Sequence, residues 1–105
     1  GTSDAIKGML PVADNLERAL AQKECSVEDL MKGVEMVQTQ FLDSLKKLGV
    51  TPMGNVGDEF NPEIHNAVSH IDDENLEINV ISAVFQKGYM LGDKVVRHAM
   101  VQVAN

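Results

Sequence analysis

Apolar residues in the first part of the chain recur at spacings of three and four. The set comprises Ile6, Met9, Leu10, Ala13, Leu16 and Leu20. Such spacing places side chains on one face of an α-helix. Pro11 interrupts the pattern. Because proline removes a backbone donor and clashes with the preceding turn, we expect a kink or a helix restart at this residue.

A second helix has clear signals at both ends. Ser26-Val27-Glu28-Asp29 fits a capping box, in which Ser26 accepts a backbone hydrogen bond and Asp29 reaches back. Lys46 and Lys47 suit the negative end of the helix dipole, and Gly49 can adopt the left-handed conformation that often follows a helix. We therefore predict a helix of about 23 residues that ends before Gly49.

The apolar stripe of this second helix is broader than one partner helix can cover. Two such helices would form a hairpin with exposed apolar faces, and two hairpins would form a four-helix bundle. We therefore expect a homodimer; in the alternative, the C-terminal half of the same chain covers the stripe. The residues expected at the dimer interface are Leu16, Leu20, Leu30, Val34, Val37, Phe41 and Leu45.

Gly33 lies inside the second helix, where a glycine costs about 1 kcal/mol relative to alanine. It is either a tolerated solvent position or a point at which another helix or a binding partner approaches the backbone closely.

The second half of the chain alternates as β-strands do. Residues 79–85 are apolar on both faces, which predicts a strand buried on both sides. Leu91-Gly92-Asp93-Lys94 predicts a two-residue hairpin turn, followed by a return strand over 95–103 with alternate residues on opposite faces. Residues 53–57 and 71–77 are expected to be loops.

These patterns predict an α+β fold with two domains. Residues 4–49 would form a helical dimerisation domain, half of a four-helix bundle, and residues 50–105 a small β-rich domain. The opening Gly1-Thr2-Ser3 is interpreted as a cloning remnant and is set aside.

Charge and composition narrow the classes of partner. The net charge is −7, with no Lys/Arg run, so nucleic acid and anionic membranes are not expected partners. The formal charge is −2 over residues 1–50 and −5 over residues 51–105. The sequence contains no apolar run long enough to span a membrane. The single cysteine, Cys25, excludes an internal disulfide and suits a reduced, cytoplasmic location.

Candidates for catalysis and metal binding are weak. His65 and His70 are five residues apart, a spacing that does not align them on a helix face and puts them on opposite faces of a strand. No phosphate-binding loop, nucleophile elbow or zinc-protease motif is present. We therefore expect no catalytic residues, no metal and no cofactor. An enzyme that uses the histidines stays open as a weaker hypothesis.

Several motifs, in order along the chain, resemble the GrpE family, the nucleotide exchange factors of DnaK-type chaperones. Leu10-Pro11-Val12-x-Asp14-x-Leu16-x-Arg18-Ala19-Leu20 resembles the first bundle helix of that family, and Gly33-Val34-Glu35-Met36 the second. Phe60-Asn61-Pro62-x-x-His65-x-Ala67-Val68 is similar to its Phe-Asp-Pro-x-x-His-x-Ala-Val signature. Gln86-Lys87-Gly88-Tyr89-x-Leu91 and Val96-Arg97-x-Ala99-Met100-Val101-x-Val103 resemble its closing hairpin.

The resemblance implies a homodimeric co-chaperone without enzyme activity. Its β-domain, called the wing, would press against the ATPase domain of a DnaK-type chaperone, open the cleft and release ADP. The residues that the resemblance assigns to partner binding are Phe60, Phe85, Lys94 and Val103 in the wing and Gly33 in the bundle. It also implies a long helix before the bundle, of which this chain has only a few residues.

Other interpretations of these residues stay open. On composition alone, Phe85 and Val103 fit the core of the wing better than an interface, and Lys94 fits a solvated hairpin tip. His65 is expected to satisfy a local hydrogen bond in its turn, while His98 has no assigned role. A purely structural dimerisation module, without exchange activity, is the main alternative function.

Overall fold

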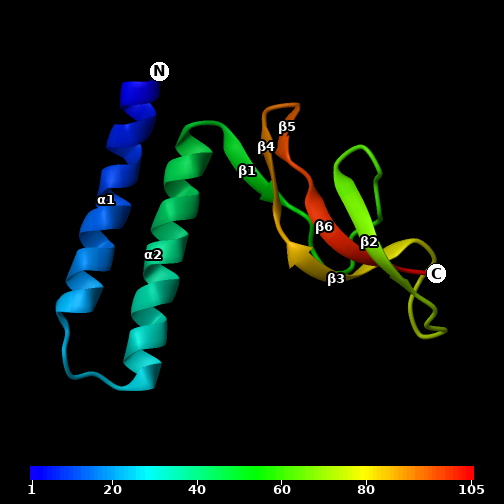
Figure 1. Cartoon of the computed structure of the whole chain (residues 1–105), viewed down its shortest axis with the longest axis horizontal. Coiled ribbons are helices and arrows are strands. Elements are labelled where there is room, and N and C mark those ends of the chain that lie inside the picture. The colour runs from blue at the N-terminus through cyan, green and yellow to red at the C-terminus, as the bar shows by residue number, and fades with distance from the viewer. The chain divides into compact units, whose positions relative to one another are not determined.

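The computed structural model describes residues 1–105 and has the predicted α+β fold (Figure 1). Contacts divide the chain into two compact units, Gly1–Leu48 and Gly49–Asn105. We call these the helical unit and the β unit. Their roles as dimerisation domain and wing remain predictions.

The first helix, α1, runs from Thr2 to Ala21 without interruption. The helix does not restart at Pro11, while the alternative expectation, a kink at this residue, stays a prediction. Proline has a backbone φ that suits a helix and removes a single donor, so one proline does not end a helix that packs along a second one. Thr2 and Ser3, set aside as a remnant, belong to this helix.

The second helix, α2, spans Val27–Lys47, and its predicted ends are confirmed. The Ser26 hydroxyl accepts a hydrogen bond from the backbone N–H of Asp29 over 3.1 Å. Lys46 and Lys47 occupy the last turn. Gly49 has a φ of 86°, the left-handed conformation that follows many helices.

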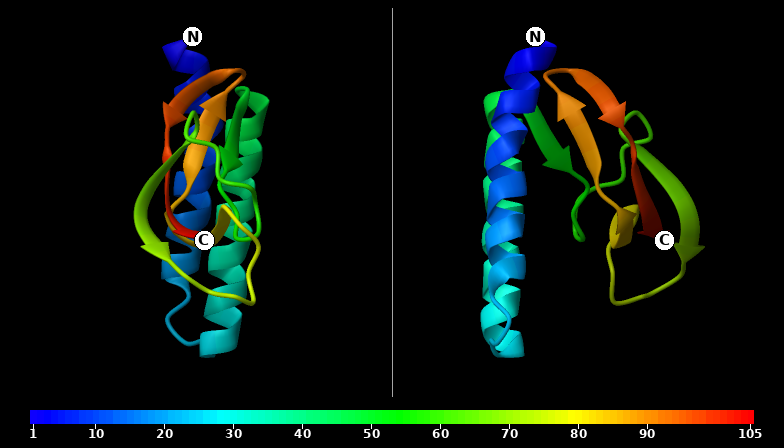
Figure 2. Two further views of the ribbon diagram at one scale, coloured as in Figure 1. Left: turned by 90° about the vertical axis from the view of Figure 1, so that its right-hand side faces the viewer. Right: turned by 60° about the vertical axis from the view of Figure 1, so that its left-hand side comes forward.

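Helices α1 and α2 form an antiparallel hairpin (Figures 1 and 2). Their contact seam combines small and polar residues with Val37 and Phe41 of the predicted α2 stripe, whereas the predicted α1 stripe lies outside it. The Asn15 side-chain amide of α1 donates to Gln40 of α2. The least exposed residues along the seam are Ala5, Gly8, Val12, Asn15 and Ala19 on α1 and Gly33, Val37, Gln40, Phe41 and Ser44 on α2.

The β unit contains six strands in two three-stranded sheets. The first sheet has the order β1-β4-β5 and is antiparallel throughout. The second has the order β2-β6-β3, in which β2 is parallel and β3 antiparallel to β6. The strands are β1 (Val50–Met53), β2 (His65–Ile71), β3 (Val80–Gln86), β4 (Gly88–Leu91), β5 (Lys94–Arg97) and β6 (Ala99–Ala104).

A long hairpin, bent in its middle, connects the two sheets. β3 and β4 are separated by Lys87 alone, and β5 and β6 by His98 alone. Since β3 pairs with β6 and β4 with β5, these four strands form one hairpin. Its first arm consists of β3 and β4, and its second arm consists of β5 and β6. The predicted turn between Leu91 and Lys94 is confirmed, with Gly92 at a φ of 59°. The single return strand predicted over 95–103 is wrong, because the chain changes sheets at His98.

Gly88 allows the two arms to approach at the bend. A Cβ atom built there would lie 2.6 Å from the Ala99 backbone nitrogen and 2.2 Å from the end of the Met53 side chain. Both distances are shorter than real contacts permit, so this position requires glycine.

The core of the β unit consists of Ile81, Ala99, Val101 and Val103, with Met53, Phe60 and Val84 packed against it. The predicted alternation along β6 is confirmed, since Ala99, Val101 and Val103 are buried while Met100 is exposed. Strand β3 was predicted to be buried on both sides, but Phe85 is 59% exposed. The register shift between Val84 and Gln86 turns this residue out of the alternation.

The loop predicted over residues 71–77 begins one residue later than expected, at residue 72, because Ile71 is the last residue of β2. The side-chain amide of Asn105 donates to the backbone carbonyls of Asp73 and Leu76, over 2.8 and 2.9 Å. This residue therefore fastens the loop to the end of β6.

Candidate partner-binding surfaces

The helical unit exposes large apolar side chains on one side of the hairpin. Leu20 is 83% and Leu30 48% exposed, whereas Val37 lies in the seam at 9%. Successive residues of an α-helix are rotated by about 100° around its axis. On this basis the exposed stripe of each helix lies to one side of the residues in the seam, and the direction of rotation from seam to stripe is the same in both helices. Because the helices are antiparallel, both stripes face the same side. We call this the apolar side; it contains Met9, Leu16, Leu20, Val27, Leu30, Met31 and Val34.

The seven residues expected at the dimer interface are therefore not all in one environment. Leu16, Leu20, Leu30 and Val34 are exposed on the apolar side, and Phe41 and Leu45 are half-buried. The exposed members have no covering element within the helical unit.

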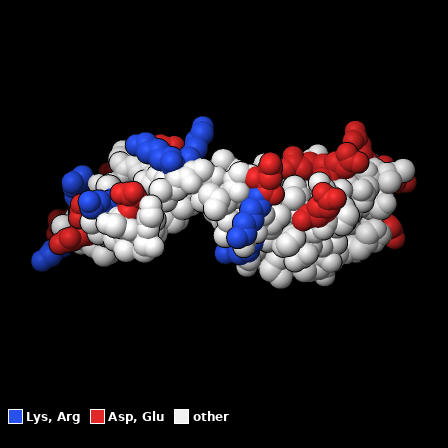
Figure 3. All heavy atoms as spheres, turned by 90° about the horizontal axis from the view of Figure 1, so that it is seen from above, with Lys and Arg blue, Asp and Glu red and all other residues white.

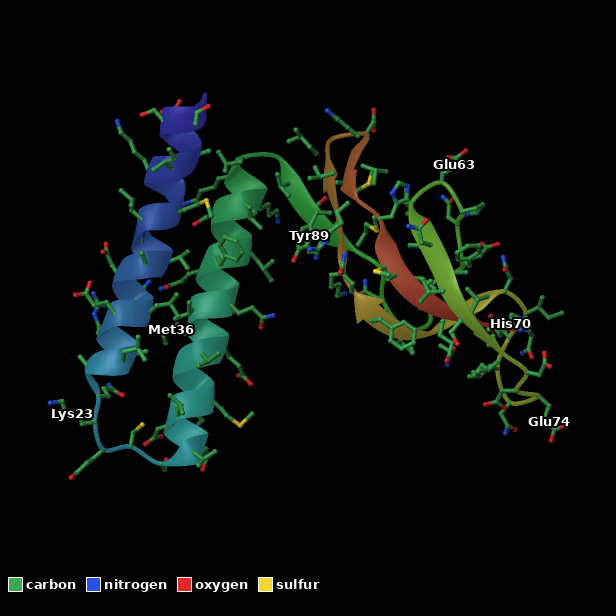
Figure 4. The ribbon with its side chains drawn as sticks, viewed as in Figure 1. Lys23, Met36, Glu63, His70, Glu74 and Tyr89 are labelled. Carbon is green, nitrogen blue, oxygen red and sulfur yellow. The ribbon has the colours of Figure 1, made fainter.

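The opposite side of the hairpin carries a groove of about 690 Å³ near the α1–α2 loop. Gly33 lies on its floor, and Met36, labelled in Figure 4, lines it from α2. The lining carries charges of both signs, from Arg18 and Lys32 and from Glu24 and Asp29. No atom lies within 4 Å of a Cβ built at Gly33, so the fold of the hairpin does not require glycine there.

One face of the β1-β4-β5 sheet combines basic and apolar side chains. Cross-strand register places Leu91 beside Lys94 and Tyr89 beside Arg97, so all four side chains share a face. Pro52 of β1 pairs with Tyr89 on the same face. The Arg97 guanidinium stacks over the Tyr89 ring, 5.3 Å from its centroid. We call this set of five residues the basic sheet face.

The basic sheet face contrasts with the rest of the β unit. Residues 49–105 hold eight acidic and three basic residues, and the three are Lys87, Lys94 and Arg97. In Figure 3 the blue side chains of this unit gather at one end, whereas red side chains lie both beside them and over the remainder. The sequence analysis identified Lys94 but not Arg97 or Tyr89. A regular register read across the predicted turn would pair Tyr89 with Val96, and only the register shift between Tyr89 and Met90 brings Arg97 opposite Tyr89.

The remaining residues predicted to bind a partner differ in accessibility. Phe85 is exposed on β3, and Phe60 is half-buried against the core, with its ring 5.9 Å from that of His65. Val103 is only 5% exposed and belongs to the core. Val103 is therefore not accessible for direct contact with a partner, because the alternation along β6 directs its side chain into the core.

His65 is buried, and hydrogen bonds join it to Asn61. Its Nδ1 accepts a hydrogen bond from the Asn61 N–H over 2.9 Å, while its own N–H donates to the Asn61 carbonyl over 2.8 Å. Burial lowers the pKa of the His65 imidazole, and the nearby Asp58 carboxylate opposes this only in part. His65 therefore fastens the turn that precedes β2, as expected from the sequence.

The three histidines occupy separate places. His98 has its Nε2 3.1 Å from the Glu63 carbonyl at the bend of the hairpin, and His70 is exposed near the end of β2 (Figure 4). No group of three His, Cys, Asp or Glu side chains is arranged to hold a metal ion.

Neither helix combines the length and the hydropathy that a membrane span requires.

Comparison with known proteins agrees with this architecture. The family model described as GrpE matches residues 1–105. The "Protein GrpE" of Clostridium acetobutylicum is 56% identical over 103 residues, which cover 98% of this chain and 50% of the relative. That of Clostridium beijerinckii is 53% identical over 102 residues (97% and 48%), and that of Haemophilus ducreyi 47% over 103 (93% and 52%). The chain thus spans about half the length of these curated relatives, and it belongs to the GrpE family.

Proposed function

We propose that this chain is the bundle and wing portion of a nucleotide exchange factor for a DnaK-type chaperone. It would bind the chaperone's ATPase domain and promote release of ADP. Membership of the GrpE family supports this assignment. The structural observation that carries it is the basic sheet face, a concentrated basic and apolar surface in an otherwise acidic unit.

The proposed mechanism needs no bond chemistry. The factor would bind the open, nucleotide-poor state of the ATPase domain more tightly than the closed state. Only this difference in affinity shifts the equilibrium towards opening. By reciprocity, nucleotide bound to the chaperone weakens its affinity for the factor. The β unit suits such a role because backbone pairing with β1 and with each other holds β4 and β5 in register.

The proposed contacts are Lys94 and Phe85, which are exposed, and Phe60, which lines a hollow of about 610 Å³ beside Met53 and His65. Gly33 is proposed as a contact from the helical unit. Phe85 offers apolar area, and Lys94 offers a charge that can pair with a carboxylate of the partner.

We further propose that two copies pair through their apolar sides to form a four-helix bundle. Pairing would cover the exposed leucine and valine side chains of both hairpins, which favours association. The groove that contains Gly33 lies on the opposite side and stays open in such a dimer. Gly33 could then contact the chaperone while the dimer is intact.

The decisive experiment measures release of a fluorescent ADP analogue from a DnaK-type ATPase domain. Addition of the 105-residue chain should accelerate release, and light scattering should give twice its 11.5 kDa mass. A folded dimer that leaves release unchanged at tens of micromolar would support the alternative, a structural dimerisation module. A monomer with no acceleration would contradict both proposals. The free thiol of Cys25 suits the reduced cytoplasm, where we place this activity.

A further inference from the structure

The bend of the long hairpin carries a specific clamp. Arg97 is the last residue of β5, and Lys87 is the single residue between β3 and β4. The Arg97 Nε and Nη2 atoms both donate to the Lys87 backbone carbonyl, over 3.2 and 2.9 Å. One guanidinium thereby joins the two places at which the chain passes from one sheet to the other.

Further contacts restrain the same guanidinium and the same bend. The Arg97 guanidinium also stacks over the Tyr89 ring, which favours the orientation that it has in the clamp. On the same arm as Arg97, the Ala99 N–H donates to the Ile64 carbonyl over 3.2 Å. Gly88 permits the close approach of the arms that the Arg97 clamp then fixes.

The clamp lies between two surfaces that must act together. Lys94 is on the β1-β4-β5 sheet, and Phe85 is on the β2-β6-β3 sheet. The long hairpin links these sheets through the single residues Lys87 and His98. A change of angle at the bend would therefore move Lys94 relative to Phe85 without disturbing the core around Val101.

We propose that Arg97 is a positioning residue for partner binding: its bidentate bond across the bend fixes where Lys94 stands relative to Phe85. This inference rests on the proposed function. It assigns to Arg97 an action through Lys94 rather than a contact with the chaperone. Lysine at this position keeps the charge but lacks the planar fork and its stacking.

A double-mutant cycle tests the proposal through affinity for the ATPase domain. Arg97→Lys should weaken binding by about threefold to tenfold, although the net charge is unchanged. Lys94→Ala should weaken binding clearly in the unaltered chain but much less in the Arg97→Lys background, because Lys94 is then already displaced. Full affinity of Arg97→Lys would overturn the clamp, and additive effects of the two changes would overturn the action through Lys94.

Gly33→Asp is the matched control for the cycle. Gly33 belongs to the helical unit, so its effect on affinity should add to that of Arg97→Lys without coupling. If Gly33→Asp were coupled to Arg97→Lys as strongly as Lys94→Ala is, the action of Arg97 would not be local to the bend.

Residual dipolar couplings of the free protein give a readout that needs no chaperone. In the unaltered chain, amides of β4–β5 and of β2-β6-β3 should fit one alignment, and in Arg97→Lys they should need two. A single alignment in the variant would overturn the clamp. Should Arg97→Lys unfold, Tyr89→Leu removes only the ring and should produce the same loosening in weaker form. If the unaltered chain fails to bind the ATPase domain, the proposed function and the positioning role fall together, while the couplings still decide on the clamp.

Discussion

The helical unit and the β unit cover their apolar side chains in different ways. In the β unit, Ile81 and Val101 are fully buried by strands of the same chain. In the helical unit only Val37 is buried, and the largest side chains of both helices are exposed on one side. The β unit is therefore expected to hold its structure alone, whereas the helical unit needs a second copy.

The sharpest test of this contrast places a charge on the apolar side. Leu30→Asp should dissociate the proposed dimer, because burying an unpaired carboxylate costs at least about 3 kcal/mol. Light scattering should give a monomer, circular dichroism should show loss of helix, and the amide spectrum of the β unit should persist. Met36→Asp, on the groove side of the same helix, should keep the dimer. Equal behaviour of the two variants would refute the assignment of sides.

The complementary test truncates a buried side chain in the core of the β unit. Ile81→Ala should destabilise this unit by about 2–5 kcal/mol, the usual cost of truncating a fully buried isoleucine. Denaturant unfolding followed by amide signals of β3 and β6 should show the loss, while the solution mass stays unchanged. Ile78→Ala, at a residue 81% exposed, serves as the control and should have little effect. A simultaneous loss of the dimer would mean that the two units do not fold independently.

Gly33 separates the requirements of folding from those of binding. Gly33→Ala should stabilise the hairpin by about 1 kcal/mol, because alanine favours helix and its Cβ meets no atom. Gly33→Asp should leave the dimer intact and lower affinity for the ATPase domain. Thermal unfolding and binding are measured on both variants. A destabilised Gly33→Ala variant would show that another helix approaches this residue.

The smallest expected effect is a pH dependence confined to the β unit. Burial lowers the folded-state pKa of His65 below its ordinary value of 6.5, so the unfolded chain binds the proton more readily. The stability from this group is complete above that value and is lost as the pH falls through the lowered pKa. Urea unfolding of the β unit between pH 7.5 and 5 should show the decline relative to His65→Gln. A decline of the same size in the variant would assign it to other groups.

The sequence predicted the features that depend on near neighbours. The Ser26 cap, the Gly49 helix end, the Gly92-Asp93 turn and the inward alternation of Val101 and Val103 all follow from local backbone and periodicity rules. The family motifs also predicted that a helical unit precedes a β-rich unit along the chain.

The sequence did not predict β1, β2 and β4 as strands. Two are four residues long, β1 contains Pro52, and β2 pairs in parallel with a strand over 30 residues later. The exposure of Phe85 depends on a register shift, which alternation does not reveal. The α1 stripe and part of the α2 stripe face away from the seam, although Val37 and Phe41 of the α2 stripe lie in it.

For the candidate site, the sequence by itself determined which side chains carry charge or apolar area: Lys94, Phe85 and the leucines of the two helices. Only the tertiary structure decided which of them are accessible. In the structure Val103 is buried in the core and Phe85 is exposed. The Arg97 guanidinium donates across the bend to the Lys87 carbonyl. The physical reason is that side-chain type is local, whereas exposure and cross-sheet hydrogen bonds depend on residues distant in the chain.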